Sequence, residues 1–204
     1  MPLYTMSSDA PETRQRILKS TLSLLETGKG TVIRMSDIAK RAGITRQALY
    51  LHFSTRAELL IAVTLYVEEK YGSEAALAPS RNAKTGIERL DAYINAWANF
   101  LPEIHGIAKA LMSMSETDDA AAIAWKGRMK AMRHGCEAAI NALSRDKRLS
   151  PLLTREQAID TLWTMLSVQN WEQLVQECGW TPEEYGQRMK TLARRLFVTD
   201  EPRR

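Results

Sequence analysis

Cysteine is scarce in this chain, which has only Cys136 and Cys178 among its 204 residues. Two cysteines so far apart build no disulfide framework, so we expect two free buried thiols, and a single bridge stays open as the alternative. No apolar run approaches the roughly eighteen residues of a membrane-spanning helix, and the first residues lack a basic start followed by an apolar core. These absences predict a cytoplasmic protein with no membrane partner.

The sequence signatures of enzymes and metal proteins are missing as well. The histidines are His52, His105 and His134, and a helix would place His134 and Cys136, which are close in sequence, on nearly opposite flanks. No glycine-rich phosphate loop, nucleophile elbow or HExxH string appears. We therefore expect no enzymatic activity, no metal and no cofactor.

Alternation of apolar and polar residues at period two is also absent, whereas apolar residues recur at steps of three and four, so the chain is predicted to be all-α. Asp9 and Pro11 mark the start of a first helix that ends at Gly28, and residues 73–84 are expected to form a loop or a frayed helix end. Further predicted helices run from Ser54 or Thr55 to Gly72, from Ile87 to Phe100 before Pro102, from Ile104 to Met114, from about Ala120 to Ser144, from Arg155 to Cys178 and from Pro182 to Val198.

One stretch, residues 38–60, reads IAKRAGITRQALYLHFSTRAELL. Ala39, Gly43 and Leu49 have the spacing of a helix-turn-helix: a small residue where two helices touch, a glycine in the turn and an apolar residue returning to the core. The second helix carries polar side chains that can reach phosphates or base edges. These are Thr45, Arg46, Gln47, Tyr50 and His52.

The order of residues in this stretch closely resembles the DNA-binding domain of the TetR (tetracycline repressor) family of bacterial transcriptional regulators. Arg34 stands where that family usually has a capping hydroxyl residue, so Ser36 is the nearest candidate cap, and Arg56 keeps a positive charge where lysine is usual. The resemblance implies a three-helix helix-turn-helix DNA-binding domain over residues 1–57 and a larger helical ligand-binding and dimerisation domain over residues 58–204. The predicted DNA-contacting residues are Arg34, Ser36, Thr45, Arg46, Gln47, Ala48, Tyr50, His52 and Arg56.

The distribution of charge supports this interpretation. Residues 1–57 carry nine lysines and arginines against four acidic residues, although the whole chain has a net charge of only +4. The positive excess therefore lies with the predicted DNA-binding segment, as attraction to phosphates requires, although a solvated face can also hold such charges.

Methionines and aromatic residues cluster in the middle of the chain, where the resemblance implies a ligand cavity. Flexible thioethers and flat rings suit an adaptable apolar pocket, and ordinary core is the alternative. The candidate ligand-binding residues are Trp97, Phe100, His105, Met112, Trp125, Met129 and Met132.

The predicted helix from Arg155 to Cys178 is apolar on more than one side, which suggests that one side meets another subunit. The resemblance implies that the last two helices pair with their counterparts in a homodimer, and monomer core is the alternative. The candidate interface residues are Trp163, Leu166, Trp171, Leu174, Tyr185, Met189, Leu192 and Leu196.

These expectations converge on a ligand-responsive, dimeric transcriptional regulator. It would act as a repressor that binds a palindromic double-stranded DNA operator and is released by a small apolar effector. The alternative function is a helical small-molecule or protein-binding module whose helix-turn-helix is merely structural.

Overall fold

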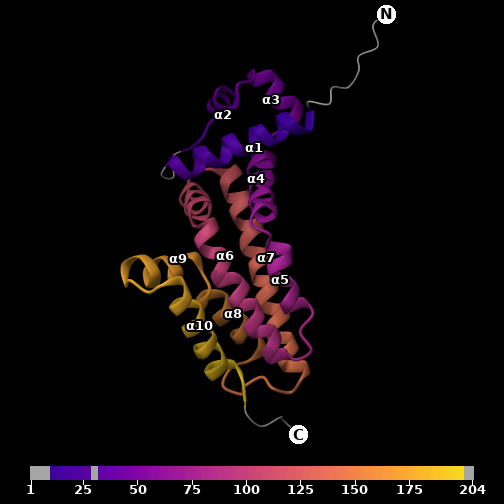
Figure 1. Cartoon of the computed structure of the whole chain (residues 1–204), viewed down its shortest axis with the longest axis vertical. Helices are drawn as coiled ribbons and strands as arrows, with labels where there is room; N and C mark the ends of the chain where they lie inside the picture. The colour runs from indigo at the N-terminus through magenta and orange to yellow at the C-terminus, as the bar shows by residue number, and fades with distance from the viewer. Residues whose placement is uncertain (1–9, 29–31, 200–204) are drawn as a thin grey trace, which may run out of the picture. The chain divides into compact units, whose positions relative to one another are not determined.

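The computed structural model describes residues 10–28 and 32–199, and this part of the chain is built from helices, as predicted (Figure 1). The predicted Asp9 cap lies outside the described residues. None of the described residues belongs to a strand, and an isolated bridge pairs Leu149 with Val198. The helices are α1 (Ala10–Thr27), α2 (Met35–Ala42), α3 (Arg46–His52), α4 (Arg56–Lys70), α5 (Ser73–Arg81), α6 (Gly86–Met114), α7 (Asp119–Arg145), α8 (Arg155–Met165), α9 (Val168–Trp171), the π-helix η1 (Glu172–Glu177) and α10 (Pro182–Phe197).

Within residues 10–28 and 32–199, no helix combines the length and apolarity needed to cross a bilayer.

The described residues form two compact units. The first contains residues 10–28, 32–67 and 106–126, and the second contains residues 68–105 and 127–199, so α4, α6 and α7 contribute to both. The division by packing differs from the sequence division at residue 57, because Leu59, Leu60 and Val63 of α4 are fully buried in the first unit. Packing alone does not test the functional boundary at residue 57, which stays a prediction.

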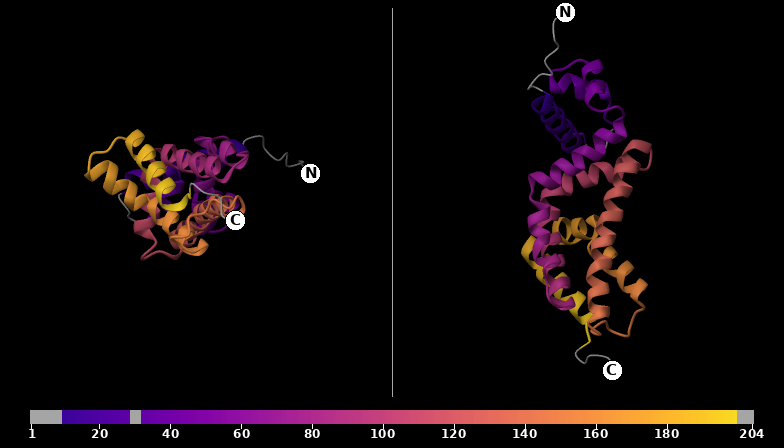
Figure 2. Two further views of the ribbon diagram at one scale, coloured as in Figure 1. Left: turned by 90° about the horizontal axis from the view of Figure 1, so that it is seen from below. Right: turned by 90° about the vertical axis from the view of Figure 1, so that its right-hand side faces the viewer.

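The first unit is organised around the amphipathic helix α1. Its buried face carries Ile17, Leu22 and Leu25 at helical spacing, and the helix packs against α2, which in turn packs against α3 (Figure 2). A polar contact joins α2 to α1, since the guanidinium of Arg41 donates to the hydroxyl of Ser23 at 2.6 Å. The three helices thus share one apolar core.

In the second unit, residues 73–84 include the helix α5 in place of the predicted loop or frayed helix end. Gly72 has φ 65° and ψ 36°, a left-handed conformation that suits glycine and separates α5 from α4. The hydroxyl of Ser80 donates to the carbonyl of Arg89 on α6 at 3.1 Å, and Arg81 pairs with Glu74 along the helix. Contacts to α6 and within α5 stabilise a segment whose composition suggested a loop.

The break predicted before Pro102 is wrong, because α6 runs without interruption from Gly86 to Met114. A proline removes one donor, so the carbonyl of Ala98 lacks its usual helical partner. Ala98 and Leu101 are nevertheless buried, and we attribute the continuity of α6 to this packing, which outweighs one lost hydrogen bond.

The single helix predicted from Arg155 to Cys178 is interrupted after α8. The carbonyl of Leu166 accepts a 2.6 Å hydrogen bond from the indole N–H of Trp97 on α6. Ser167 then caps α9 by accepting the amide N–H of Asn170. The chain therefore turns at residues 166 and 167, and it continues through α9 into η1 before α10 packs against α8 (Figure 2).

Close approach of α6 and α7 in the second unit depends on two glycines. The amide of Gly86 donates to the carboxylate of Asp146 at 2.5 Å, and a β-carbon at this position would lie 2.5–2.7 Å from the backbone of Ala142 and Leu143. At Gly135, a β-carbon would overlap the ring of Tyr93. Neither position has room for a side chain.

Candidate nucleic-acid interface

The turn between α2 and α3 has the geometry that the motif predicted. Gly43 adopts φ 67° and ψ 35°, which is a left-handed conformation. The backbone N–H groups of Gly43 and Ile44 donate hydrogen bonds to the last carbonyls of α2, and the one from Ile44 to Ala39 is 3.0 Å long. The requirement for glycine is conformational, because no atom lies within 4 Å of the place where its β-carbon would be.

The start of α2 differs from the expectation that Ser36 is its cap. The helix begins at Met35, with Arg34 in the extended cap position and Ser36 one residue inside the helix. The backbone N–H of Arg34 donates to the carboxylate of Asp37 at 3.3 Å. Asp37 therefore supplies the acidic half of a capping arrangement, which lets an arginine occupy the cap position. Both Arg34 and Ser36 are exposed, as a phosphate contact requires.

The start of α3 uses Thr45 as its cap. The hydroxyl of Thr45 accepts the amide of Ala48 at 3.1 Å. A hydroxyl that accepts through a lone pair still carries its own hydrogen, so Thr45 can cap the helix and donate to a phosphate at the same time.

One aliphatic and one aromatic side chain anchor α3 to the core. Leu49 and Phe53 are fully buried, and the guanidinium of Arg14 from α1 covers the Phe53 ring at 4.4 Å from its centroid. Their burial on one side turns the opposite side of α3 to solvent.

The exposed side of α3 carries most of the residues predicted to meet DNA. Arg46, Gln47 and Tyr50 are exposed, and the guanidinium of Arg46 lies 5.6 Å from the ring centroid of Tyr50. This cation–π contact orders two long side chains on the helix surface. Ala48 and His52 are half-buried at the flanks of the same helix.

Leu51 is a residue of this surface that motif reasoning missed. Its side chain is 85% exposed, the highest value among the large hydrophobic residues found exposed. Helical spacing relative to Leu49 could have found it, because a residue two positions away faces nearly the opposite direction.

Arg56 is held within the first unit by an acidic partner. Its Nη1 lies 2.5 Å from Oδ2 of Asp118, and the two side chains are 19% and 6% exposed. Asp118 immediately precedes α7, and its other carboxylate oxygen accepts the amides of Ala120 and Ala121. A role for Arg56 at phosphates stays a prediction, and that role would have to coexist with this ion pair.

The start of α4 confirms Thr55 as its cap. Thr55 accepts the amide of Glu58 at 3.0 Å, and the carboxylate of Glu58 accepts both the amide and the hydroxyl of Ser54. These hydrogen bonds from Ser54 hold the pKa of the Glu58 carboxyl below its usual range. The reciprocal bonds fix the connection that follows α3.

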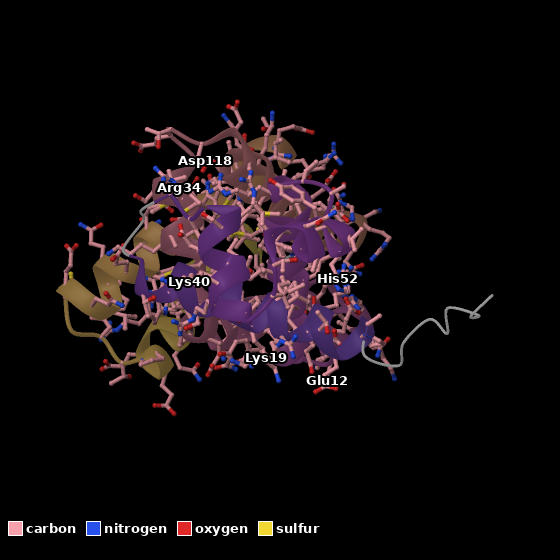
Figure 3. All side chains as sticks on the ribbon, turned by 90° about the horizontal axis from the view of Figure 1, so that it is seen from above. Glu12, Lys19, Arg34, Lys40, His52 and Asp118 are labelled. Atoms are coloured by element: carbon pink, nitrogen blue, oxygen red, sulfur yellow. The ribbon has the colours of Figure 1, made fainter. Side chains whose placement is uncertain are left out.

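Charged side chains are distributed over several elements of the first unit. Figure 3 labels Lys19, Arg34, Lys40 and His52, which come from α1, the cap of α2, α2 and α3. Lys19, Arg34 and Lys40 are exposed. Such cations can contact phosphates at several points around a recognition helix.

The predicted ligand-binding residues belong to both units. Met112 and Trp125 lie in the first, whereas Trp97, Phe100, His105, Met129 and Met132 lie in the second. Within the second unit, the rings of Trp97 and Phe100 are 6.0 Å apart, and His105 stacks obliquely on Trp171 at 5.0 Å. The carbonyl of Met132 accepts the hydroxyl of Tyr93 at 2.8 Å. A ligand site at these residues stays a prediction.

A groove of about 530 Å³ lies elsewhere in the second unit, between α5, α6 and α10. Asp91 and Arg194 face each other across it and form an ion pair. Its lining is more polar than the apolar pocket predicted from sequence, and it includes none of the seven candidate ligand-binding residues.

The predicted dimer-interface residues divide into two sets by burial. Leu166, Trp171, Tyr185 and Met189 are already buried within one chain, so they have little surface left for a partner. Their side chains fit the monomer-core alternative. The second set stays a predicted interface, with Leu192 exposed and three residues half-buried: Trp163, Leu174 and Leu196.

Both cysteines are free, as expected, but Cys178 is exposed where two buried thiols were predicted. It directly follows η1, at the end of the interrupted segment.

Comparison with known proteins places the motif in a family. Residues 17–63, which cover most of α1, all of α2 and α3 and the start of α4, match the model of bacterial regulatory proteins of the tetR family. The chain is 39% identical over 57 residues to the HTH-type transcriptional regulator SrpR of Pseudomonas putida, covering 28% of this chain and 27% of SrpR.

A longer alignment extends beyond the helix-turn-helix. The chain is 26% identical over 99 residues to the nucleoid occlusion factor SlmA of Marinobacter nauticus, covering 48% of this chain and 51% of SlmA. The match thus spans about half the length of that relative.

The whole fold also has a counterpart among solved structures. A TetR-family transcriptional regulator from Rhodococcus sp., described as putative, superposes with a TM-score of 0.70 at 19% identity, covering 92% of this chain and all of the other. At this identity the likeness shows the fold alone. Fold and motif agree, and residues 17–63 belong to the tetR family of bacterial regulatory proteins.

Proposed function

We propose that this chain is a dimeric transcriptional repressor that binds a palindromic operator and releases it when a small apolar effector binds. The observation that carries the proposal is the surface of α3. Leu49 and Phe53 fix one side of this helix in the core, while Arg46, Gln47 and Tyr50 project from it into solvent. A helix anchored on one side with such groups on the other suits the major groove.

The positive charge of residues 1–57 supports the same surface, because it supplies the attraction to phosphates that precedes base recognition. Regulators of this family bind DNA and typically form dimers. In a dimer, two copies of α3 would enter successive major grooves about 34–36 Å apart. The operator would then contain two half-sites related by a two-fold axis.

A gel-shift assay on the DNA flanking the chain's own gene tests the proposal. We expect a discrete complex that survives excess non-specific DNA, and footprinting should show two protected tracts about ten base pairs apart. If no duplex is bound selectively, the proposal fails, and a helical binding module with a structural helix-turn-helix becomes the better interpretation.

Substitutions on α3 distinguish the contribution of base contacts to operator binding from that of positive charge in general. Arg46→Ala and Gln47→Ala should each cost about 1 to 3 kcal/mol in operator binding and relax specificity at one position. Arg145→Ala, which removes an exposed arginine at the end of α7, is the matched control and should leave specificity unchanged. Equal losses in all three variants would contradict the assignment of α3.

The effector part of the proposal rests on the aromatic and sulfur-containing residues of the second unit. An apolar ligand beside Trp97 and Met129 should quench tryptophan fluorescence and lower operator affinity, because coupling between two sites is reciprocal. Met129→Trp should remove the response and leave DNA binding intact, since the larger ring would fill the space. If wild type and Met129→Trp release DNA equally, the effector acts elsewhere.

The SlmA alignment favours a second candidate function. It covers 99 residues, about twice the length of the family match, so the likeness includes residues outside the helix-turn-helix. Under this second candidate, the chain would bind DNA without controlling the adjacent gene. Mapping the sites occupied on the chromosome decides between the two: a few sites upstream of genes with changed transcription support a repressor, and dispersed sites with unchanged transcription support the second candidate.

A further inference from the structure

Leu51 has no structural reason to be a leucine in the isolated chain. It lies near the end of α3, and 85% of its side chain is exposed. Exposing a large aliphatic side chain in water forgoes the roughly 1.5 to 3 kcal/mol that its burial would contribute. The structure gives this side chain no role in the core.

The geometry of α3 places Leu51 beside Gln47. The two residues are four positions apart, a step of one helical turn and about 40° more. Leu49, which is 0% exposed, lies two positions from each, or about 200° around the helix. Gln47 and Leu51 therefore project together from the middle of the outward side, whereas Tyr50 and His52 lie on its flanks.

We propose that Leu51 reads a thymine by packing against its 5-methyl group in the major groove, next to a base pair contacted by Gln47. Such a methyl group is the apolar feature that thymine presents in this groove, and aliphatic side chains contact it. The proposal rests on the DNA-binding function proposed above and adds a specificity-determining residue to it.

Charge and spacing both favour DNA as the occupant of this surface. The surrounding segment, residues 1–57, has five more basic than acidic residues, which suits a polyanion. The α-carbons of Gln47 and Leu51 are about 6 Å apart along the helix axis, and base pairs stack every 3.4 Å or so. One amide and one aliphatic side chain can thus meet neighbouring base pairs, and glutamine suits an adenine edge.

The test compares thymine with uracil, which differs from it by that methyl group. A preferred duplex is first selected from a randomised pool with the full chain. Each thymine is then replaced by deoxyuridine in turn, and dissociation constants are measured at one salt concentration. For the wild type, we expect one position per half-site where uracil weakens binding about fourfold, the effect of one buried methyl group.

The Leu51→Ala variant should bind the thymine and uracil duplexes equally at that position, while Leu51→Met, which keeps an apolar side chain, should retain the difference. Because residue 51 is exposed, both variants should melt like the wild type. Leu152→Ala is the matched control, since Leu152 is a 71% exposed leucine of the second unit, and it should leave the thymine-to-uracil ratio unchanged.

Two results overturn the proposal. The wild type could show no sensitivity to uracil at any position, or Leu51→Ala could keep the wild-type ratio at every position. If the pool enriches no sequence at all, the proposed DNA-binding function fails together with this inference. That outcome is distinguishable, because in the first two results a selective duplex exists.

Discussion

The guanidinium of Arg56 lies 2.5 Å from the carboxylate of Asp118, and this ion pair links the first residue of α4 to the residue that precedes α7. The same carboxylate accepts the amides of Ala120 and Ala121, so it caps one helix while it pairs with another. Because Asp118 is only 6% exposed, little water is available to replace either interaction.

Asp118→Ala should therefore destabilise the chain. We expect a loss of about 3 kcal/mol, the low end of the cost of breaking a buried pair, since Arg56 keeps some exposure. Urea unfolding followed by circular dichroism measures it. Asp119→Ala removes the exposed neighbouring carboxylate and serves as the control. Equal midpoints for the two variants would show that the ion pair contributes nothing.

The ion pair also makes the predicted phosphate role of Arg56 testable. If Arg56 contacts a phosphate, Arg56→Ala should weaken binding to all DNA sequences alike. It should also reduce by about one the slope of the logarithm of the binding constant against the logarithm of the salt concentration. Asp118→Ala keeps the guanidinium and should leave the slope unchanged. A change in sequence preference for Arg56→Ala would assign this residue to a base instead.

Leu192 provides the sharper test of the dimer. Its side chain is 46% exposed on α10, so Leu192→Glu should leave the chain folded and produce monomers by burying an unpaired charge in the interface. Light scattering gives the mass and circular dichroism the fold. Leu152→Glu, at another exposed leucine, should remain dimeric. A monomeric wild type at micromolar concentration would refute the dimer itself.

The two thiols should differ in reactivity. Burial raises the pKa of the Cys136 thiol to about 12, whereas Cys178 is exposed. At pH 8 a thiol-specific reagent should modify one cysteine rapidly in the native chain and two after denaturation, because the thiolate is the reacting form. Cys178→Ser should abolish the rapid phase. Rapid modification of two sites in the native chain would contradict the packing around Cys136.

Gly135→Ala should destabilise the second unit strongly. A β-carbon there would lie 2.5–2.6 Å from the hydroxyl oxygen and Cζ of Tyr93, whose hydroxyl is already committed to the carbonyl of Met132. Overpacking of this kind costs about 1 to 3 kcal/mol. Thermal melting measures it, with Gly127→Ala as the control, since no atom lies within 4 Å of a β-carbon at Gly127. A melting temperature equal to that of the control would overturn this expectation.

Local patterns predicted the helical class and the helix-turn-helix, since the signals at Ala39, Gly43 and Leu49 lie within a few residues of one another. They failed where distant residues decide the backbone. The break after Leu166 involves the indole of Trp97, 69 residues earlier, and Pro102 sits within an unbroken helix next to buried neighbours.

The candidate site shows the same limit. The polar side chains on α3 could be chosen by residue type, whereas Leu51 was not chosen, because hydrophobicity alone does not say which way a side chain points. Nor did the sequence indicate the ion pair between Arg56 and Asp118, which lies 62 positions later in the chain. Helical spacing could have found Leu51, whereas the partner of Arg56 required the three-dimensional arrangement of the first unit.

The absence of space at Gly86 has a consequence for genetic studies of this protein. The atoms that a β-carbon would meet there belong to the backbone of Ala142 and Leu143, which cannot rotate away as a side chain can. In a mutational screen for loss of DNA binding, residue 86 should therefore score as intolerant as α3. Such variants would reflect loss of folded protein, and measuring protein abundance beside DNA binding would keep them from being mistaken for variants of the DNA-binding surface.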